Sequence, residues 1–406
     1  MSKKNDDFFV AKKPWSGVKD RLLECYLKPY VLKILHTYRP LVYVDCFAGK
    51  GKFDDGNPGS PLIALNIFKD AVKETRISDE AHIRAIFIDA NYARDLEMNL
   101  GEYNGVEVVA DYYENVIDRL LKTELGSNVF LYIDPYGIKA LDCEKFDAYA
   151  NGQFNTIELL INMNSFGFIR EACNAFGEKF KIDEDDFFDE LVEYDSTRLD
   201  ASDNAKIALN RIAGGNYWID IIKKYKNGMI DGYKAEEEFS EKYCQRLRKS
   251  YRYVLNMPIR IRAGNHSKYR MIHATNHPDG CILMAENICK RSELLRDIQS
   301  GGQLALFKED FNNQIIEESQ IKEYVNEHFS KYLEWTSITE AEADFFVNYG
   351  AICRTHDIAT VLKKMEMNKQ IEVLRNPCVT PQGKPTTFMT EGHGQKVKVR
   401  VKWVKR

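Results

Sequence analysis

Short apolar runs alternate with amphipathic segments along the first 165 residues of the chain. Five of these runs have the length and composition of buried strands, at 41–45, 83–88, 106–109, 129–133 and 156–161. Helical periodicity covers 15–38 with an interruption at Pro29, about 60–75, and the stretch from Asp111 through Leu121. Strands that alternate with helices predict a parallel sheet with helices on both faces.

The pattern becomes long and helical beyond residue 165, and we interpret about 165–250 as a helical insertion into the same domain. Two strands then close this domain, at 253–262 and 269–274. We expect the first domain at 1–295, a linker at 296–330 and a smaller domain at 331–406. Helical segments near 317–332 and 339–347, followed by strands at 371–374 and 396–402, resemble a winged helix.

The last predicted strand, K-V-K-V-R-V-K-W, carries a row of cations. Its valines occupy alternate positions, so the opposite face of the strand carries Lys396, Lys398, Arg400 and Lys402. Such a row suits contact with nucleic-acid phosphates, and exposed edge strands also use lysine to resist aggregation. The sequence leaves both interpretations open.

The composition is that of a globular protein, since 44% of the 406 residues are hydrophobic. With a net charge of −4, the protein is not positively charged overall, so nucleic-acid binding would require a local patch of basic side chains. Nine cysteines without a C-x-x-C pair predict reduced thiols, and the spacing of His273, His277 and Cys281 does not indicate a metal site. With no secretory signal and no long uncharged apolar run, we expect a cytoplasmic protein without membrane contact.

The stretch L-V-Y-V-D-C-F-A-G-K-G-K, residues 41–52, is the first candidate binding site. A strand that ends on Asp45 leads into a small-residue loop with Ala48, Gly49 and Gly51, and open parallel sheets bind ligands beyond the carboxyl ends of their strands. The loop matches neither G-x-x-x-x-G-K-[ST] nor a complete G-x-G-x-x-G. A strand-tip acid suits a cofactor with a cation and hydroxyls, such as S-adenosylmethionine (SAM). The alternative is an ordinary strand-to-turn junction.

Acids also follow the second and third strands. Asp89 and Ala90 come after the strand at 83–88, where a carboxylate can accept both ribose hydroxyl protons. Asp111 follows the third strand and could accept from the adenine amino group. The alternative for Asp89 is a surface turn acid. We do not count Lys19 among the site residues, because its place one helical turn after Trp15 usually reflects packing and solvation.

Asp134, Pro135 and Tyr136 begin the tetrapeptide D-P-Y-G after the fourth strand. Methylation of an exocyclic amine requires acceptors for the amino protons, because the nitrogen lone pair is delocalised into the ring. A carboxylate and a neighbouring backbone carbonyl can be these acceptors, while an adjacent aromatic side chain stacks on an unpaired or flipped base. The alternative is a proline turn at a strand end.

Together, D-C-F-A-G-K-G, I-D-A-N, A-D-Y and D-P-Y-G resemble motifs one to four of class I SAM-dependent methyltransferases. D-P-Y-G is similar to the D-P-P-Y of adenine-N6 methyltransferases and to the D-P-F-G of tRNA guanine-N2 methyltransferases. Over about residues 10–290, through H-A-T-N-H-P-D-G, the chain also resembles the three-Cys-motif partner family of bacteria and phages. The resemblance implies a Rossmann-like seven-stranded fold and a partner with a three-cysteine motif.

We therefore expect a SAM-dependent methyltransferase that acts on an amino group of a nucleic-acid base, with RNA ahead of DNA. Asp134, Pro135 and Tyr136 would be its catalytic residues, and the glycine loop with Asp89, Ala90 and Asp111 would bind the cofactor. Two alternatives stay open. One is a non-catalytic module that serves as a partner for a three-cysteine-motif protein, and the other is an enzyme that methylates protein or a small molecule.

Overall fold

The computed structural model describes residues 9–12, 14–75, 83–101, 103–135, 137–181, 203–259, 269–299, 316–391 and 397–404. The chain divides into two compact units, Met1–Asn276 and His277–Arg406. This division lies before helix α11 (Pro278–Gln299), whereas the sequence pattern placed the end of the first domain at residue 295. Contacts between α11 and α13 (Ile338–Tyr349) explain why α11 belongs to the second unit.

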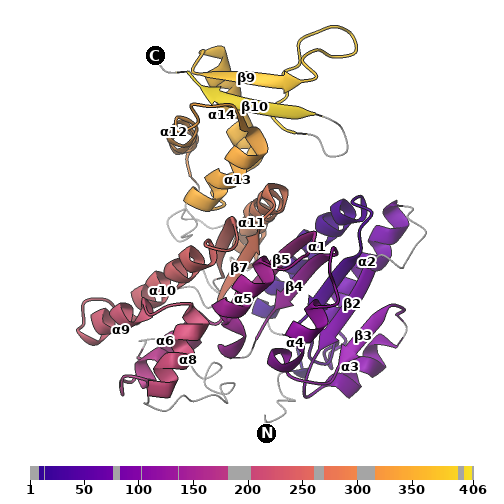
Figure 1. Cartoon of the computed structure of the whole chain (residues 1–406), viewed down its shortest axis with the longest axis vertical. Coiled ribbons are helices and arrows are strands. Elements are labelled where there is room, and N and C mark those ends of the chain that lie inside the picture. The colour runs from indigo at the N-terminus through magenta and orange to yellow at the C-terminus, as the bar shows by residue number, and fades with distance from the viewer. Residues whose placement is uncertain are drawn as a thin grey trace. The chain divides into compact units, whose positions relative to one another are not determined.

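A seven-stranded sheet forms the centre of the first unit, with the strand order β3-β2-β1-β4-β5-β7-β6 (Figure 1). The five parallel strands are β1 (Leu41–Asp45), β2 (Ile83–Ile88), β3 (Val106–Val109), β4 (Asn128–Ile133) and β5 (Thr156–Met163). Strand β7 (Tyr269–Thr275) is antiparallel to both of its neighbours, β5 and β6 (Tyr253–Ile259). The structure thus confirms the mixed α/β class and the Rossmann-like, mostly parallel sheet.

Side-chain alternation gives the sheet two apolar faces. On one face, aromatic residues of helix α1 (Pro14–Leu35) pack on the sheet, where Tyr26 and Tyr30 contact Phe130. Helix α2 (Ser60–Thr75) joins α1 there, with Phe68 against Tyr43. The core on the other face includes residues of α4 (Tyr113–Leu121), α5 (Cys143–Ala150) and the helical insertion. Helix α3 (Ala93–Leu100) lies beside β3, and a short 3₁₀ helix spans Lys139–Leu141.

Helix α1 continues through Pro29, so the expected interruption there was wrong. Proline inside a helix costs about 3 kcal/mol because it removes a hydrogen bond and crowds the preceding turn. The neighbouring Tyr26, Leu27, Tyr30 and Val31 are all buried. Burial of each such side chain contributes about 1.5–3 kcal/mol, which together outweighs the cost of the proline.

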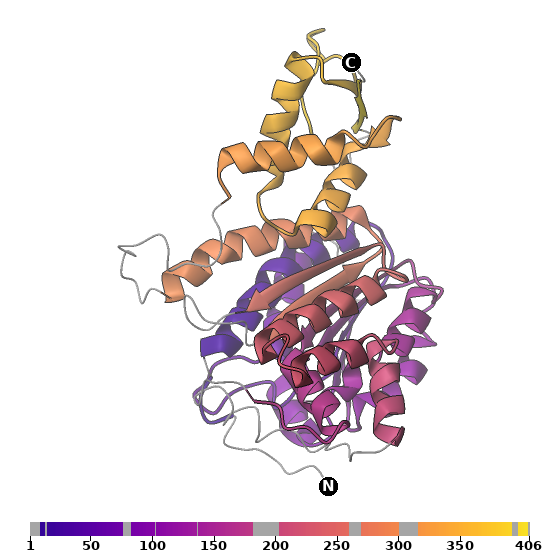
Figure 2. The ribbon, with the colours of Figure 1, turned by 90° about the vertical axis from the view of Figure 1, so that its left-hand side faces the viewer.

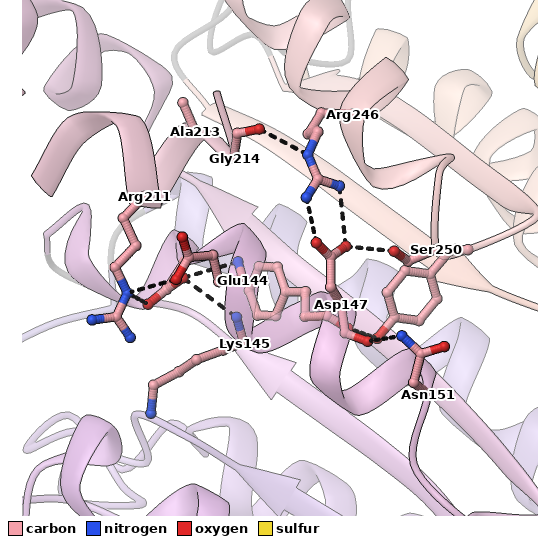
Figure 3. Close-up of polar contacts among 12 residues, drawn as sticks. Glu144, Lys145, Asp147, Asn151, Arg211, Ala213, Gly214, Arg246 and Ser250 are labelled. Atoms are coloured by element: carbon pink, nitrogen blue, oxygen red, sulfur yellow. Dashed lines mark hydrogen bonds and ion pairs between the residues drawn. The ribbon is translucent and has the colours of Figure 1, made fainter. Parts of the chain in front are cut away.

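The helical insertion contains α6 (Ser165–Asn174), α8 (Asp203–Ala213), α9 (Trp218–Lys226) and α10 (Gly232–Leu247). Polar contacts to α5 hold it in place (Figure 3). Arg246 of α10 donates through Nη1 to Asp147 Oδ1 at 3.1 Å and through Nε to the carbonyl oxygen of Gly214 at 2.8 Å. Nε of Arg211, in α8, lies 2.8 Å from Oδ2 of Asp142, the residue that caps the start of α5.

The second unit follows α11 with α12 (Glu318–Phe329), β8 (Thr336–Ser337), α13, α14 (Thr355–Met367), β9 (Ile371–Asn376) and β10 (Lys398–Trp403) (Figures 1 and 2). The strands form a three-stranded antiparallel sheet in the order β8-β10-β9. The sequence indicated only the β9–β10 pair, because a two-residue strand such as β8 has no detectable periodicity.

Strand positions otherwise follow the apolar pattern closely, with one difference that matters for the site. Strand β5 continues to Met163, two residues beyond the expected end, and therefore includes Asn162. The expected strand at 253–262 extends past the described part of β6. Of the helices within the described ranges, none combines the length and the apolar character that a bilayer span requires.

Candidate functional site

Three acids lie at the carboxyl ends of neighbouring strands. Asp45 ends β1, Asp89 follows β2 and Asp134 follows β4, and these strands are adjacent in the order β2-β1-β4. Because parallel strands end at the same edge of a sheet, the three carboxyl groups gather there. Burial raises the pKa of Asp45, and the negative charges of Asp134 and Asp89 add to this shift. The structure therefore brings together acids that are up to 89 residues apart in the sequence.

The glycine loop passes over the end of β2. Ala48 donates its backbone N–H to the carbonyl oxygen of Ile88 at 3.0 Å, and Gly49 N donates to Asp89 Oδ2 at 2.9 Å. Gly49 and Gly51 have φ angles of 60° and 77°, in the left-handed region that favours glycine. A Cβ atom at Gly51 would lie 2.8 Å from Leu96 Cδ1, so a larger residue would require either the Leu96 side chain or the loop to shift.

Asp89 fixes this loop through three backbone contacts. Besides Gly49, its carboxylate accepts from Asn91 N at 2.8 Å and from Tyr92 N at 2.7 Å, both through Oδ1. The side chain is buried, while the following Ala90 is half-buried. With one contact on Oδ2, that oxygen keeps acceptor capacity for a ligand hydroxyl.

Asp45 is completely buried at the end of β1. Its Oδ2 accepts from Ser60 Oγ at 2.6 Å, and its Oδ1 accepts from Phe47 N at 3.3 Å. Burial raises the pKa of Asp45 to about 7, although the two hydrogen bonds act in the opposite direction. Asp45 is therefore poised between its neutral and ionised forms near neutral pH. Ser60, the first residue of α2, thus donates its hydroxyl to this acid.

Asp134 is held by two residues, Lys19 and Asn162, that the sequence pattern did not place among the site residues. Lys19 Nζ of α1 lies 3.0 Å from Oδ1 and 2.7 Å from Oδ2, and Asn162 Nδ2 of β5 donates to Oδ1 at 2.6 Å. The sequence pattern assigned Lys19 to packing and solvation, whereas the helix places its ammonium on the carboxylate. Pro135 is buried, and Tyr136 lies outside the described residues.

The segment before α1 lies on the glycine loop. Lys12 Nζ is 2.5 Å from Asp20 Oδ2 and donates to the carbonyl oxygen of Pro58 at 2.8 Å. Burial raises the pKa of Asp20, although the charges of Lys12 and Lys19 oppose this. The Phe9 ring packs 3.0 Å from the position that a Cβ atom at Gly49 would occupy. These contacts add cations and a half-buried acid to the strand-end cluster.

Asp111 makes local contacts at the start of α4. Its Oδ1 accepts from Tyr112 N at 2.7 Å and from Asn115 Nδ2 at 2.8 Å. These hydrogen bonds, the one from Asn115 first, lower the pKa of Asp111. The adenine role expected for Asp111 stays a prediction, since its contacts also explain the residue as a helix-start acceptor.

The cations of β10 alternate with buried valines, as the period of two indicated. Lys398 and Arg400 are exposed and Lys402 is half-buried, whereas Val399 and Val401 are buried. Two acids lie beside this row: Glu391 Oε2 is 3.7 Å from Lys398 Nζ, and Glu372 is the register partner of Lys402 on β9. Lys396 lies outside the described residues.

Among the residues that the structure describes, no group of three or more histidine, cysteine or acidic side chains is placed to hold a metal ion.

Comparisons with known proteins leave the family open. The resemblance to the three-Cys-motif partner family rests on the short motifs alone and stays a prediction. No protein-family model matches the chain, and no curated protein matches it either.

Proposed function

We propose that the first unit is a SAM-dependent methyltransferase that acts on an exocyclic amino group of a nucleic-acid base, with RNA ahead of DNA. The observation that carries this proposal is the strand order β3-β2-β1-β4-β5-β7-β6 with acids at three adjacent strand ends. Dinucleotide-binding sheets are mostly parallel and have the order 3-2-1-4-5-6, without a seventh strand inserted before the last one. Five parallel strands followed by a reversed hairpin are typical of SAM-dependent methyltransferases.

The strand-end residues fit this cofactor. Asp45 and the loop of Ala48, Gly49 and Gly51 would hold its methionine end, because an acid at the strand end suits a ligand that carries a positive charge. Asp89 with Ala90 would hold the ribose through the acceptor capacity left on Oδ2, and Asp111 the adenine. When bound, SAM supplies an electrophilic methyl group on a positively charged sulfur.

Asp134 would orient the acceptor amine. An ionised carboxylate offers about four acceptor directions, and Lys19 and Asn162 take three of them. The direction that the described residues leave open and the carbonyl of Pro135 would accept the two amino protons. A base in a duplex cannot reach such a strand-end site, so the target would be unpaired or flipped out, with Tyr136 as its stacking partner.

The second unit would deliver the substrate. Its order of helix, strand, two helices and hairpin is typical of winged-helix domains, which supports the earlier expectation. Lys398 and Arg400 on β10 and Lys363 on α14 are exposed and would contact phosphates. A three-cysteine-motif protein would be a further partner, and the enzyme would act in the cytoplasm.

The test is to incubate the protein with radiolabelled SAM and total RNA, DNA or protein from a bacterial host, and to digest whichever pool takes up label. We expect the label in an N-methylated purine of RNA. Calorimetry in parallel measures SAM binding. Label confined to protein would favour protein methylation, and a chain that binds no SAM would favour the non-catalytic partner instead.

A further inference from the structure

Asn162 has one buried polar atom without a partner. Its Nδ2 donates to Asp134, which fixes the orientation of the amide because a carboxylate in an ion pair with lysine can only accept. The amide oxygen is buried, and within the described parts of the chain no hydrogen-bond donor reaches it. An unpaired buried acceptor destabilises a fold. A leucine of similar volume would avoid this cost, so stability alone does not account for Asn162.

Lys19 holds the same carboxylate from the opposite element. Its ammonium contacts both oxygens of Asp134, and its side chain is only 12% exposed. One donor thus comes from α1 and the other from β5. A carboxylate held by donors from two separate elements cannot rotate freely about its terminal bond.

A second polar contact pins α1 to the same strand. Tyr26, two helical turns after Lys19, donates its hydroxyl to Glu158 of β5. The same hydroxyl oxygen lies 3.0 Å from His273 Nε2. Glu158 and Asn162 are four positions apart, so their side chains share one face of β5. Two contacts therefore fix the position of α1 along β5. One is the hydrogen bond from Tyr26 to Glu158, and the other is Asp134, which binds both Lys19 of α1 and Asn162 of β5.

We propose that Lys19 and Asn162 are positioning residues that hold the Asp134 carboxylate in one orientation, with the acceptor direction that the described residues leave open toward the target amine. The inference rests on the proposed function. In the reaction the amine nitrogen bonds to the methyl carbon as the carbon–sulfur bond breaks, and the electron pair of that bond stays on sulfur. The nitrogen then gives up one proton to the Asp134 carboxylate, which passes it to water.

The first variant is Asn162→Leu, compared with Asn256→Leu as a matched control. The amide oxygen of Asn256 is also buried without a partner among the described residues, yet this residue lies on the other face of the sheet. Asn256 pairs with Ile272 of β7 and Asn162 with Met271, and successive strand residues point to opposite faces. We expect Asn162→Leu to slow single-turnover methyl transfer by about 10- to 100-fold, as the loss of a hydrogen bond to a charged group does. SAM affinity should stay within about twofold, and Asn256→Leu should leave the rate unchanged.

The second variant is Lys19→Met, with Lys19→Arg as the conservative replacement. Without the ammonium, the Asp134 carboxylate loses a contact to each of its oxygens and can rotate, so kcat should fall about 10-fold or more while SAM affinity stays within about twofold. Lys19→Arg should recover part of the rate. A purely structural role would change stability without separating kcat from SAM affinity in this way.

The outcomes separate the two proposals. If the wild-type chain transfers no methyl group to any pool, the proposed function and this inference both fail. If it transfers methyl groups while Asn162→Leu and Lys19→Met match its rate, only the positioning role is refuted. Loss of folding or SAM binding in both variants would assign Lys19 and Asn162 to structure and refute the positioning role as well.

Discussion

Replacement of Asp45 by asparagine should make the protein more stable at high pH. The folded-state pKa of Asp45 is raised to about 7 by burial, whereas an aspartate in the unfolded chain has a pKa of about 3.9. Between these values the folded state holds a proton that the unfolded state has lost, so the wild type loses stability as pH rises through this window. Asparagine has similar volume, does not titrate, and escapes this loss.

The magnitude follows from the two pKa values. One pKa unit corresponds to about 1.4 kcal/mol, so from pH 5 to the folded pKa near 7 the wild type loses about 3 kcal/mol relative to Asp45→Asn. Above the folded pKa both states are ionised and the gap stays constant. The measurement is urea-induced unfolding of both proteins, followed by circular dichroism, at pH 5, 6, 7 and 8.

Asp111→Asn serves as the control because hydrogen bonds lower the pKa of Asp111. Its contribution to stability is present above the unfolded pKa and is lost on acidification, which is the opposite sign. A difference between the wild type and Asp45→Asn that stays flat from pH 5 to pH 8 would refute the reasoning. It would show that Asp45 ionises in the folded protein as it does in water.

Three further predictions test the glycine loop, the cofactor site and the substrate unit. Gly51→Ala should destabilise the protein by about 2 kcal/mol in urea unfolding, more than Gly56→Ala, because both have positive φ but only the former meets a neighbour; equal effects would rule out the contact with Leu96. Asp89→Ala should weaken SAM binding at least tenfold in calorimetry, with Asp89→Asn intermediate because it keeps one acceptor oxygen; unchanged affinity in Asp89→Ala would contradict the ribose role. Lys398→Glu with Arg400→Glu should reduce the dependence of log K on log salt for RNA binding by about 2; an unchanged slope would mean that these cations only protect the strand edge.

The apolar pattern by itself determined most of the first unit. Strands β1, β2 and β3 lie where the runs at 41–45, 83–88 and 106–109 placed them, because a buried strand needs side chains that are apolar on both faces. The same pattern located Asp45, Asp89 and Asp134 at strand ends. Such local information depends only on neighbours in the chain and is therefore readable without a structure.

Tertiary structure decided the strand order and the chemistry of the site. No local pattern indicates that β7 inserts between β5 and β6, because strand order depends on contacts between distant segments. Lys19 meets Asp134 across 115 residues, and a helical lysine looks the same in sequence whether it faces solvent or an acid. The pKa of Asp45 near 7 likewise arises from burial by the folded chain, which the residue type alone cannot express.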